Sequence, residues 1–548
     1  MPVEGFVPYK PEDAEKYNRL RWWRGITWGD MFDNATDVYP DKVGLVDDST
    51  RLTYKELREK VDRAAIGLMQ LGIKQKDFVL LQVPNWHEYV IAFFALQKIG
   101  AITVLLVSRH GLSEVNYLAG LTNPTAYIVP SHYGKIDYAP LIEGVTSTTK
   151  SIRNVITVRA MEQGKGPSLE KLIEQSELTE ANLQALAERR PDPMEVSIIL
   201  PTGGTTGLPK AVPHTHNDYI TYIEYHAKAW EITSADTLLT AAPVSHSQGM
   251  HCGLGASFFN AAKYVLTEST DAENLCKVIQ KEKVTAFPTV PAIVQRMTTL
   301  ENLASFDLSS LKKIYAGGAP STPELVKAVY EKLKCKFVNA FGSSEGVAMM
   351  TRLQDDLQTI CNTVGKKDCP YNDVKTIDQY ENEVPVGKEG EFVSKGPTVF
   401  TGYFKSEEEN KKIFTKDGYF KTGDLARIDE RGVITVTGRI KETILRGGET
   451  ISAGGIERLI CSHSGVAEAA VIGMPDKALG ERICAYVQLK PGTSLTFEEL
   501  ISYLKSVGAS VFQLPERVEF IDPIPLTKVG KVDKSALKED IKKRLGIA

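Results

Sequence analysis

The feature that most constrains the fold is an alternation of apolar runs with segments of helical periodicity. Residues 78–83 and 102–107 are almost continuously apolar, as in strands that are buried on both faces of a sheet. Residues 53–71 and 88–99 instead carry apolar side chains at helical spacing. Alternation at this pitch predicts βαβ units, so we expect an α/β fold built mostly from parallel sheets.

The pattern changes near residue 387. Short runs at 391–394, 419–421, 426–428 and 433–437 are separated by glycine and aspartate, which is typical of antiparallel strands joined by tight turns. These runs predict a β-barrel-like piece at the end of the large domain.

Chain length predicts more than one domain. A chain of 548 residues is too long for one hydrophobic core, because single cores stop growing near ~250–300 residues. Strand and helix patterns resume after residue 440 over a length that suits a small domain. We therefore expect a large N-terminal domain of residues 1–440 and a small α+β domain of residues 441–548.

Composition excludes several classes of protein. The formal net charge of −4 gives no basic excess for nucleic acid. The longest apolar run, residues 91–107, is interrupted by Gln97 and Lys98 and is shorter than the ~20 residues of a membrane span. The N-terminus lacks the basic and apolar regions of a signal peptide. The seven cysteines are scattered without a C-x-x-C pair, so we expect a cytoplasmic protein without disulfides or zinc.

A glycine- and threonine-rich loop at residues 202–210 (TGGTTGLPK) follows an apolar run at 197–200. Glycine lets the backbone approach a ligand closely, and successive N–H and hydroxyl groups can cradle phosphate oxygens. Lys210 adds a positive charge. The order differs from the P-loop, because Leu208 and Pro209 separate the last glycine from the lysine. Taken alone, the loop fits a flexible surface loop equally well.

Together with four later motifs, this loop resembles the phosphate loop of the adenylate-forming superfamily. That group includes acyl-CoA synthetases, aryl-acid ligases, nonribosomal-peptide adenylation domains and firefly luciferase. Only Gly203 departs from the family pattern of the loop. The later motifs follow in family order: residues 314–320 (IYAGGAP), 339–345 (NAFGSSE), 419–424 (YFKTGD) with 438–442 (GRIKE), and 525–531 (PLTKVGK).

The resemblance implies a site for ATP and Mg²⁺. Glu345 would be the Mg²⁺ ligand together with Thr205, while Lys210 and Lys531 would be the catalytic lysines. Asp424 would accept the ribose hydroxyls. The residues expected around the nucleotide are Thr202, Gly203, Gly204, Thr205, Thr206, Gly207, Gly317, Gly318, Ala319, Asn339, Phe341, Gly342, Ser344, Asp424 and Arg439. Two of them depart from the family pattern, with Phe341 in place of tyrosine and Ser344 in place of threonine.

The resemblance also implies that the small domain moves. Lys441 occupies the family's hinge position, and Lys531 would leave the site after the first half-reaction. A loop resembling the one that enters the site for the second half-reaction follows at Arg446, Gly447, Gly448 and Glu449. Residues 452–455 (SAGG) depart from the family pattern, so no role is carried over to that stretch.

The chemistry implied is activation of a carboxylate. The carboxylate would attack the α-phosphate of ATP, pyrophosphate would leave, and a thiol would then displace AMP from the acyl-AMP. We expect an AMP-forming acyl-CoA synthetase with ATP, Mg²⁺ and coenzyme A, since no fused carrier domain with a pantetheine serine is found. The alternative is an aryl-acid-AMP ligase that loads a separate carrier protein.

Four residues are candidates for the acyl pocket: His246, Ser247, Gly317 and Gly342. Several motifs resemble those of dihydroxybenzoate-AMP ligases and of related aryl or cyclic-acid CoA ligases. In the siderophore aryl-acid ligases, an asparagine that binds the ring hydroxyl follows the histidine. Here Ser247 takes that place, which argues against dihydroxybenzoate, because a site built for polar recognition discriminates strongly. A less polar cyclic or aromatic acid, or a medium-chain one, is expected. The roles of residues 251 and 252 stay open.

Two further classes of protein share these motifs. A luciferase-like oxygenase would have all of them, and a non-catalytic nucleotide-binding protein would bind ATP without releasing pyrophosphate. The net direction of the reaction is also open, and so is the presence of a homodimer.

Overall fold

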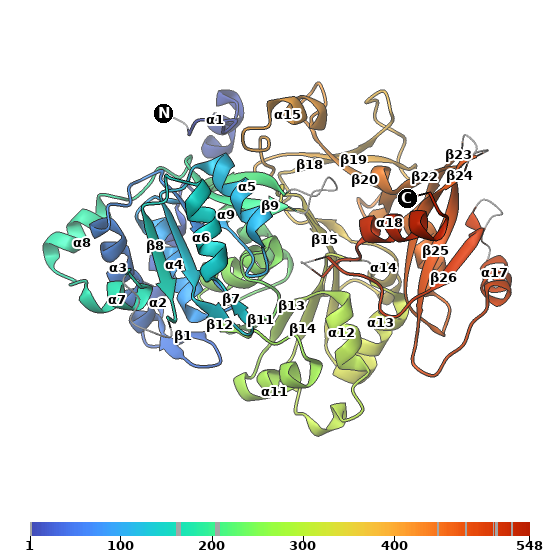
Figure 1. Cartoon of the computed structure of the whole chain (residues 1–548), viewed down its shortest axis with the longest axis horizontal. Helices are drawn as coiled ribbons and strands as arrows, with labels where there is room; N and C mark the ends of the chain where they lie inside the picture. Colours follow the sequence, from blue (N-terminus) through green and yellow to red (C-terminus); the bar gives the residue numbers. More distant parts are fainter. Residues whose placement is uncertain are drawn as a thin grey trace.

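The computed structural model describes residues 3–160, 166–202, 209–319, 321–446, 449–476, 479–507, 509, 513–527 and 530–547. Two bodies are visible in Figure 1. A large one contains the chain from the N-terminus to the strands near residue 430, and a smaller one contains the C-terminal strands and helices. The fold is mixed α/β with a large N-terminal and a small C-terminal domain, as the sequence predicts.

One six-stranded sheet forms the first layer of the large domain, in the order β10-β9-β4-β3-β5-β8. Its neighbouring strands are parallel except for β9 and β10, which form an antiparallel hairpin. The bounds are β3 Phe78–Leu81, β4 Ile102–Leu105, β5 Ala126–Pro130, β8 Asn154–Val158, β9 Val196–Thr202 and β10 Lys210–Thr215.

A nine-stranded sheet forms the second layer, in the order β17-β16-β15-β14-β13-β11-β12-β1-β2. Its inner strands are parallel, whereas β2, β16 and β17 join its two ends antiparallel. The bounds are β1 Val43–Val46, β2 Arg51–Thr53, β11 Thr237–Thr240, β12 Lys263–Leu266, β13 Ala286–Thr289, β14 Lys313–Ala316, β15 Lys336–Gly342, β16 Ala348–Met350 and β17 Lys366–Lys367.

Helices pack the two sheets together. Helix α3 begins with a capping box in which Thr53 and Glu56 satisfy each other's backbone N–H groups, and it buries the apolar face predicted from its periodicity. Helix α4 is apolar on all sides and is buried along nearly its whole length. The described helices of this domain are α1 Pro11–Arg19, α2 Trp28–Val38, α3 Tyr54–Gln70, α4 His87–Lys98, α5 Leu112–Thr122, α6 Ala139–Thr148, α7 Leu169–Gln175, α8 Glu180–Ala187, α9 His216–Ala229, the π-helix η1 Gly249–Gly255, α10 Ala256–Phe259, α11 Ala272–Glu282, α12 Pro291–Thr298, the 3-10 helix η2 Leu303–Ser305, α13 Pro323–Ala328, the π-helix η3 Val329–Leu333, α14 Leu357–Asn362 and α15 Glu407–Ile413.

The barrel-like piece expected near residue 390 is a four-stranded antiparallel sheet in the order β18-β19-β20-β21. The runs at 419–421 and 426–428 were expected to be separate strands, and this expectation is wrong. They belong to one strand, because the backbone continues through a register shift between Leu425 and Ala426 with Gly423 at a φ of +73°. The bounds are β18 Asp373–Ile377, β19 Gly390–Lys395, β20 Phe420–Ile428 and β21 Ile434–Arg439.

The small domain is a sheet covered by helices on both faces. Its order is β23-β22-β25-β24, with β26 parallel to β25. Alternate residues of β24 divide between two apolar clusters, since Val471 packs with the cluster of α16 and α17 while Ile472 packs with α18. The bounds are β22 Thr443–Arg446, β23 Glu449–Ser452, α16 Ala453–Cys461, β24 Val466–Asp476, β25 Gly480–Leu489, α17 Phe497–Ser506, β26 Arg517–Phe520 and α18 Lys534–Arg544.

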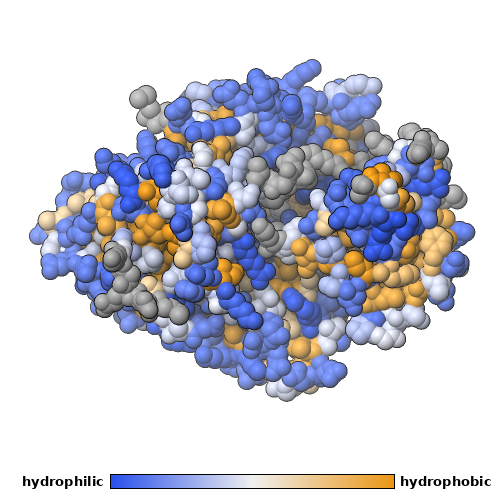
Figure 2. All heavy atoms as spheres, in the orientation of Figure 1, coloured by the Kyte–Doolittle hydropathy of each residue, from blue (hydrophilic) through white to orange (hydrophobic). Residues whose placement is uncertain are grey.

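Polar side chains predominate on the face seen in Figure 2, with apolar residues in patches between them. Within the described part of the chain, every helix is too short or too polar to cross a bilayer.

Candidate active site

The hairpin of β9 and β10 carries the predicted phosphate loop. Thr202 at the end of β9 stands opposite Lys210 at the start of β10. The loop between them, with the predicted residues Gly203, Gly204, Thr205, Thr206 and Gly207, lies outside the described residues. The described residues thus include Thr202 and Lys210 at the two ends of the predicted loop.

Tyr403 contacts both Lys210 and Glu345. The Lys210 Nζ lies 4.5 Å from the centre of the Tyr403 ring and forms an ion pair with Glu409 on α15. The Tyr403 hydroxyl donates to Glu345 Oε1 at 2.7 Å. Burial and the Glu345 carboxylate both raise the pKa of Tyr403. Tyr403 belongs to none of the sequence motifs and is 58 residues away from Glu345 along the chain.

Glu345 lies in a turn after β15 and is 9% exposed. The next residue, Gly346, has a φ of +86°, and a Cβ there would lie 1.8 Å from the Thr398 carbonyl oxygen. Phe400 donates its backbone N–H to the Glu345 carbonyl at 3.0 Å. The preceding carbonyl, that of Ser344, lies 2.6 Å from His214 Nε2. These contacts fix the backbone around the predicted metal ligand.

Asp424 and Arg439 are cross-strand partners in β20 and β21. The Arg439 Nε donates to Asp424 Oδ1 at 2.7 Å. Asp424 is 3% exposed, and burial raises its pKa to about 6 although Arg439 opposes this shift. The predicted ribose ligand is thus a buried carboxylate with one partner from the neighbouring strand.

Lys531 extends from the small domain into this site. It lies in a turn in which Thr527 N donates to the Lys531 carbonyl at 2.6 Å. Its Cε is 3.9 Å from the place where a Cβ on Gly318 would stand. The charges of Glu345, Asp424 and Arg439 all act on it. Desolvation by the surrounding atoms is the main cause that lowers the pKa of Lys531, and the positive charge of Arg439 lowers it further. The residue as a whole is nevertheless exposed to solvent.

The predicted strand motifs lie next to Lys531. Gly317 follows β14 and donates its N–H to Thr289 at 3.2 Å, and Gly318 and Ala319 are exposed beyond it. Asn339 uses its side-chain N–H₂ to hold α14, donating to the Thr363 carbonyl at 2.8 Å and to that of Ile360 at 3.4 Å. Phe341 packs against the main hydrophobic core, as a ring without a hydroxyl can.

His246 and Ser247 precede the π-helix η1, from which Gln248 separates them. Burial lowers the pKa of His246 to about 4, and Lys531 contributes to the shift. Ser247 is 5% exposed, and its carbonyl accepts from His251 Nδ1 at 2.6 Å. His246 is therefore within electrostatic reach of the small-domain lysine.

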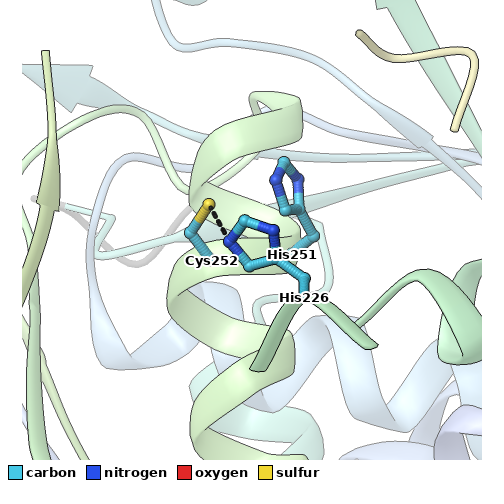
Figure 3. Close-up of side chains that lie close together, drawn as sticks. All are labelled: His226, His251 and Cys252. Atoms are coloured by element: carbon cyan, nitrogen blue, oxygen red, sulfur yellow. Dashed lines mark hydrogen bonds between the residues drawn. The ribbon is translucent and has the colours of Figure 1, made fainter. Parts of the chain in front are cut away.

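His251 joins Ser247 to a buried cluster of three side chains, His226, His251 and Cys252 (Figure 3). His226 Nε2 is 3.2 Å from Cys252 Sγ, and His226 Nδ1 is 2.9 Å from Asp368 Oδ2. Donor atoms of His226, His251 and Cys252 lie within 4.8 Å of one another, as in a metal site. His226 Nδ1 faces the Asp368 carboxylate and therefore carries the ring hydrogen, which leaves Nε2 to accept from the Cys252 thiol. Burial raises the pKa of Cys252 well above its usual value, in keeping with a protonated thiol that donates. The cluster is best described as hydrogen-bonded core.

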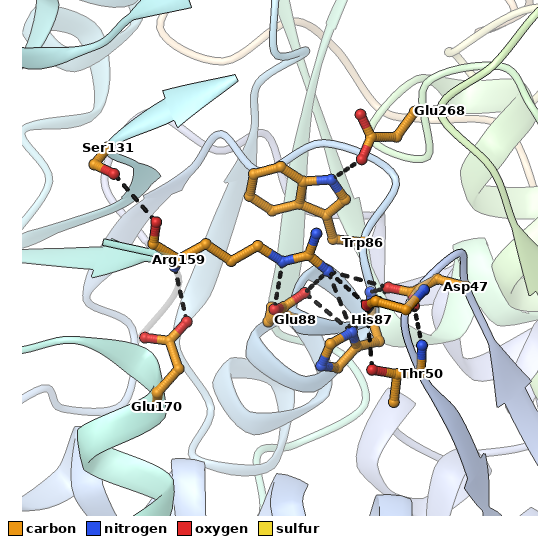
Figure 4. Close-up of polar contacts among 10 residues, drawn as sticks. Asp47, Thr50, Trp86, His87, Glu88, Ser131, Arg159, Glu170 and Glu268 are labelled. Carbon is orange, nitrogen blue, oxygen red and sulfur yellow. Dashed lines mark hydrogen bonds and ion pairs between the residues drawn. The ribbon is translucent and has the colours of Figure 1, made fainter. Parts of the chain in front are cut away.

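A second polar cluster joins three elements of the large domain (Figure 4). Arg159, after β8, donates to both carboxylate oxygens of Glu88, at 2.7 and 2.9 Å, and to Asp47 at 3.2 Å. Its guanidinium stacks 4.1 Å from the centre of the Trp86 ring. Because the Arg159 guanidinium already occupies oxygens of both carboxylates, this arrangement is best described as an ion-pair cluster that joins β1, α4 and β8.

The predicted second-step loop is described in part. Arg446 pairs with Glu516 at 2.5 Å, and Gly447, Gly448 and the side chain of Glu449 lie outside the described residues. The backbone of Glu449 pairs with Arg446 in β22 and β23.

The connector between the domains is a 3-10 turn, η4 Ile440–Glu442, which contains the predicted hinge Lys441, whose side chain lies outside the described ones. In the divergent SAGG stretch, Gly454 lies in the first turn of α16, where a Cβ would stand 3.7 Å from the Cα of Gly438. A side chain would therefore meet β21 at ordinary contact distance.

Comparison with known proteins identifies the class. The family described as AMP-binding enzyme matches residues 32–404, and the AMP-binding enzyme C-terminal domain matches residues 455–531. The chain belongs to this adenylate-forming family, and it is an adenylate-forming ligase.

Several relatives are similar over their whole length. The 2,3-dihydroxybenzoate-AMP ligase of Bacillus subtilis is 33% identical over 99% of both chains. The salicyl-AMP ligase / salicyl-S-ArCP synthetase of Mycobacterium tuberculosis is 31% identical over 99% of this chain and 95% of its own. The apo structure of MbtA from Mycobacterium smegmatis superposes with a TM-score of 0.74 at 31% identity, covering 98% of each chain.

Proposed function

We propose that the protein is an aryl-acid-AMP ligase that transfers its acyl group to a carrier protein. Relatives named for 2,3-dihydroxybenzoate and salicylate match it over nearly their full length. These comparisons favour the alternative in the sequence analysis over the acyl-CoA synthetase expected first. They also favour an aromatic acid over a medium-chain one.

The convergence of charged residues from both domains carries the proposal. Lys531 from the small domain lies over Gly318 and within electrostatic reach of Glu345, Asp424 and Arg439. This is the arrangement that an adenylation step needs, because charge develops on the α-phosphate as the carboxylate attacks. Accordingly, residues 1–440 would hold ATP and the acid, and residues 441–548 would bring Lys531 to them around Lys441.

Each side chain has a distinct part in the proposed reaction. One carboxylate oxygen of the acid forms a bond to the α-phosphorus, and the bond to pyrophosphate breaks. Lys531 would neutralise charge on the carboxylate and the α-phosphate. Asp424 would accept from the ribose hydroxyls, and Lys210 with the adjoining loop would hold the outgoing phosphates.

Glu345 fits a magnesium ion. Mg²⁺ takes one or two carboxylates and completes its shell with phosphate oxygens and water. The Glu345 carboxylate is buried, and Tyr403 fixes it through Oε1. When bound, Mg²⁺ would offset negative charge on the phosphates.

The test is product analysis with ATP, Mg²⁺ and a panel of benzoates, cyclohexane carboxylates and fatty acids. We expect pyrophosphate release and an enzyme-bound aryl-AMP, followed by transfer to an aryl carrier protein bearing phosphopantetheine. Activation of fatty acids alone would refute the aryl assignment.

Coenzyme A as the acceptor is the second candidate. A relative named salicylyl-CoA synthase / salicylate adenylyltransferase is 33% identical over 99% of this chain and 98% of its own. Parallel reactions with coenzyme A and with the carrier protein decide between the two acceptors. Aryl-CoA formed at a rate above that of carrier loading would favour coenzyme A.

A further inference from the structure

A buried histidine connects the predicted nucleotide site to helix α9. His214, in β10, is fully buried. Its Nε2 lies 2.6 Å from the carbonyl oxygen of Ser344, the residue directly before Glu345. Its Nδ1 lies 2.7 Å from Oδ1 of Asp218, in the first turn of α9. The ring thus joins the turn that carries the predicted metal ligand to an acidic residue of the neighbouring helix.

Asp218 faces this ring as a carboxylate. Its Oδ2 accepts from the backbone N–H of Thr215 at 3.0 Å and from the Thr215 hydroxyl at 2.9 Å. It also lies at the N-terminus of α9, where the helix dipole favours negative charge. Because hydrogen bonds to the charged form favour ionisation, Oδ1 of Asp218 is left as an acceptor for His214.

Both ring nitrogens of His214 therefore face oxygens that can only accept. A neutral imidazole has one N–H and one lone pair, so a neutral ring would direct its lone pair at an oxygen no more than 2.7 Å away. An imidazolium donates from both nitrogens, and the Asp218 carboxylate compensates its buried charge. His216, two residues further on, shows the opposite arrangement: its Nδ1 accepts from the Trp28 N–H at 3.2 Å, and burial lowers its pKa to about 3.

We propose that His214 is a positioning residue, held as an imidazolium, which fixes the peptide between Ser344 and Glu345 for the binding of Mg²⁺-ATP. The inference rests on the adenylation step of the proposed function. Charge-assisted hydrogen bonds are about twice as strong as neutral ones, so a charged donor holds the Ser344 carbonyl more firmly than a neutral ring would. Asp218 and the ring together anchor the predicted metal ligand to α9.

NMR of protein labelled with nitrogen-15 histidine tests the charge on the ring. Comparison with the spectrum of His214→Gln assigns the signals of His214. At neutral pH we expect both ring nitrogens to show the chemical shifts of protonated nitrogens, and we expect Mg²⁺-ATP to move these signals. A ring with one unprotonated nitrogen overturns the inference, and so do signals that saturating Mg²⁺-ATP leaves unchanged.

Two substitutions separate the two hydrogen bonds of the ring. His214→Gln places an amide N–H₂ near the position of Nε2 and keeps a donor for Ser344, whereas His214→Asn places it near Nδ1 and keeps only the bond to Asp218. In ATP–pyrophosphate exchange, we expect His214→Asn to reduce kcat/KM for Mg²⁺-ATP by ~10-fold or more, with a clearly smaller loss in His214→Gln. Equal losses in the two variants, or a value for His214→Asn within about threefold of the wild type, overturn the positioning role.

His216→Asn is the matched control, because it changes another buried histidine of the same segment and keeps an acceptor for the Trp28 N–H. It is expected to leave kcat/KM for Mg²⁺-ATP within about threefold of the wild type. The exchange is measured with whichever acid the wild-type enzyme uses best. An enzyme that activates only fatty acids refutes the aryl assignment of the proposed function, whereas the His214 variants still decide the role of the ring.

Discussion

Tyr403 links two predicted catalytic residues, so Tyr403→Phe is the most informative single change. It removes the 2.7 Å hydrogen bond to Glu345 and keeps the ring that lies against Lys210. A hydrogen bond to a charged group contributes about 1.5–3 kcal/mol. If this energy is used to hold Glu345 for the nucleotide, kcat/KM for Mg²⁺-ATP falls roughly 10- to 150-fold.

The assay is ATP–pyrophosphate exchange over a range of Mg²⁺ concentrations, with urea unfolding measured on the same samples. Tyr419→Phe is the control, because Tyr419 also donates its hydroxyl to a carboxylate, that of Asp373, at an exposed position. It is expected to leave exchange unchanged. If Tyr403→Phe keeps kcat/KM for Mg²⁺-ATP within about threefold of the wild type, the positioning argument is wrong.

Three further changes test separate parts of the structure. Lys531→Ala is expected to abolish formation of aryl-AMP while largely sparing acyl transfer from preformed aryl-AMP; equal loss of both half-reactions in single-turnover assays would contradict its assignment. Asp424 has its pKa raised from 3.8 to about 6, so the folded state keeps a proton that the unfolded chain releases, and stability falls as pH rises between those values. The loss is roughly 3 kcal/mol across this window, and urea unfolding of Asp424→Asn should show a flatter pH profile. Gly346→Ala forces a Cβ to within 1.8 Å of the Thr398 oxygen at a φ of +86°, and it should lower the free energy of unfolding by at least about 1–3 kcal/mol. Wild-type stability of this variant would show that the turn can relax.

Local patterns predicted the parallel part of the fold well. The helix expected at residues 53–71 is α3 Tyr54–Gln70, because periodicity defines its face and the Thr53 capping box defines its start. The strand β20 was predicted as two pieces. Its Thr-Gly-Asp sequence resembles a turn, and the bulge that lets a strand contain it depends on pairing with β21.

The structure brings together several residues that the sequence motifs single out for the candidate site, whose roles stay predictions. Asp424 and Arg439 meet across two strands, and Lys531 reaches Gly318. Tyr403 and Glu409 belong to none of the sequence motifs, and their contacts with Glu345 and Lys210 exist only in the folded chain.

Both cations of the large-domain site already have carboxylate partners from the chain itself: Lys210 has Glu409, and Arg439 has Asp424. In the proposed function, the nucleotide would therefore compete with carboxylates of the protein for these cations, because neither cation is unpaired before it binds. The affinity for ATP would then be a difference between two sets of ion pairs, and nonspecific polyanions that cannot match the geometry would gain little. Such a site would obtain its selectivity from competition within the protein, because the phosphates would displace Glu409 from Lys210 while Asp424 would turn to the ribose hydroxyls.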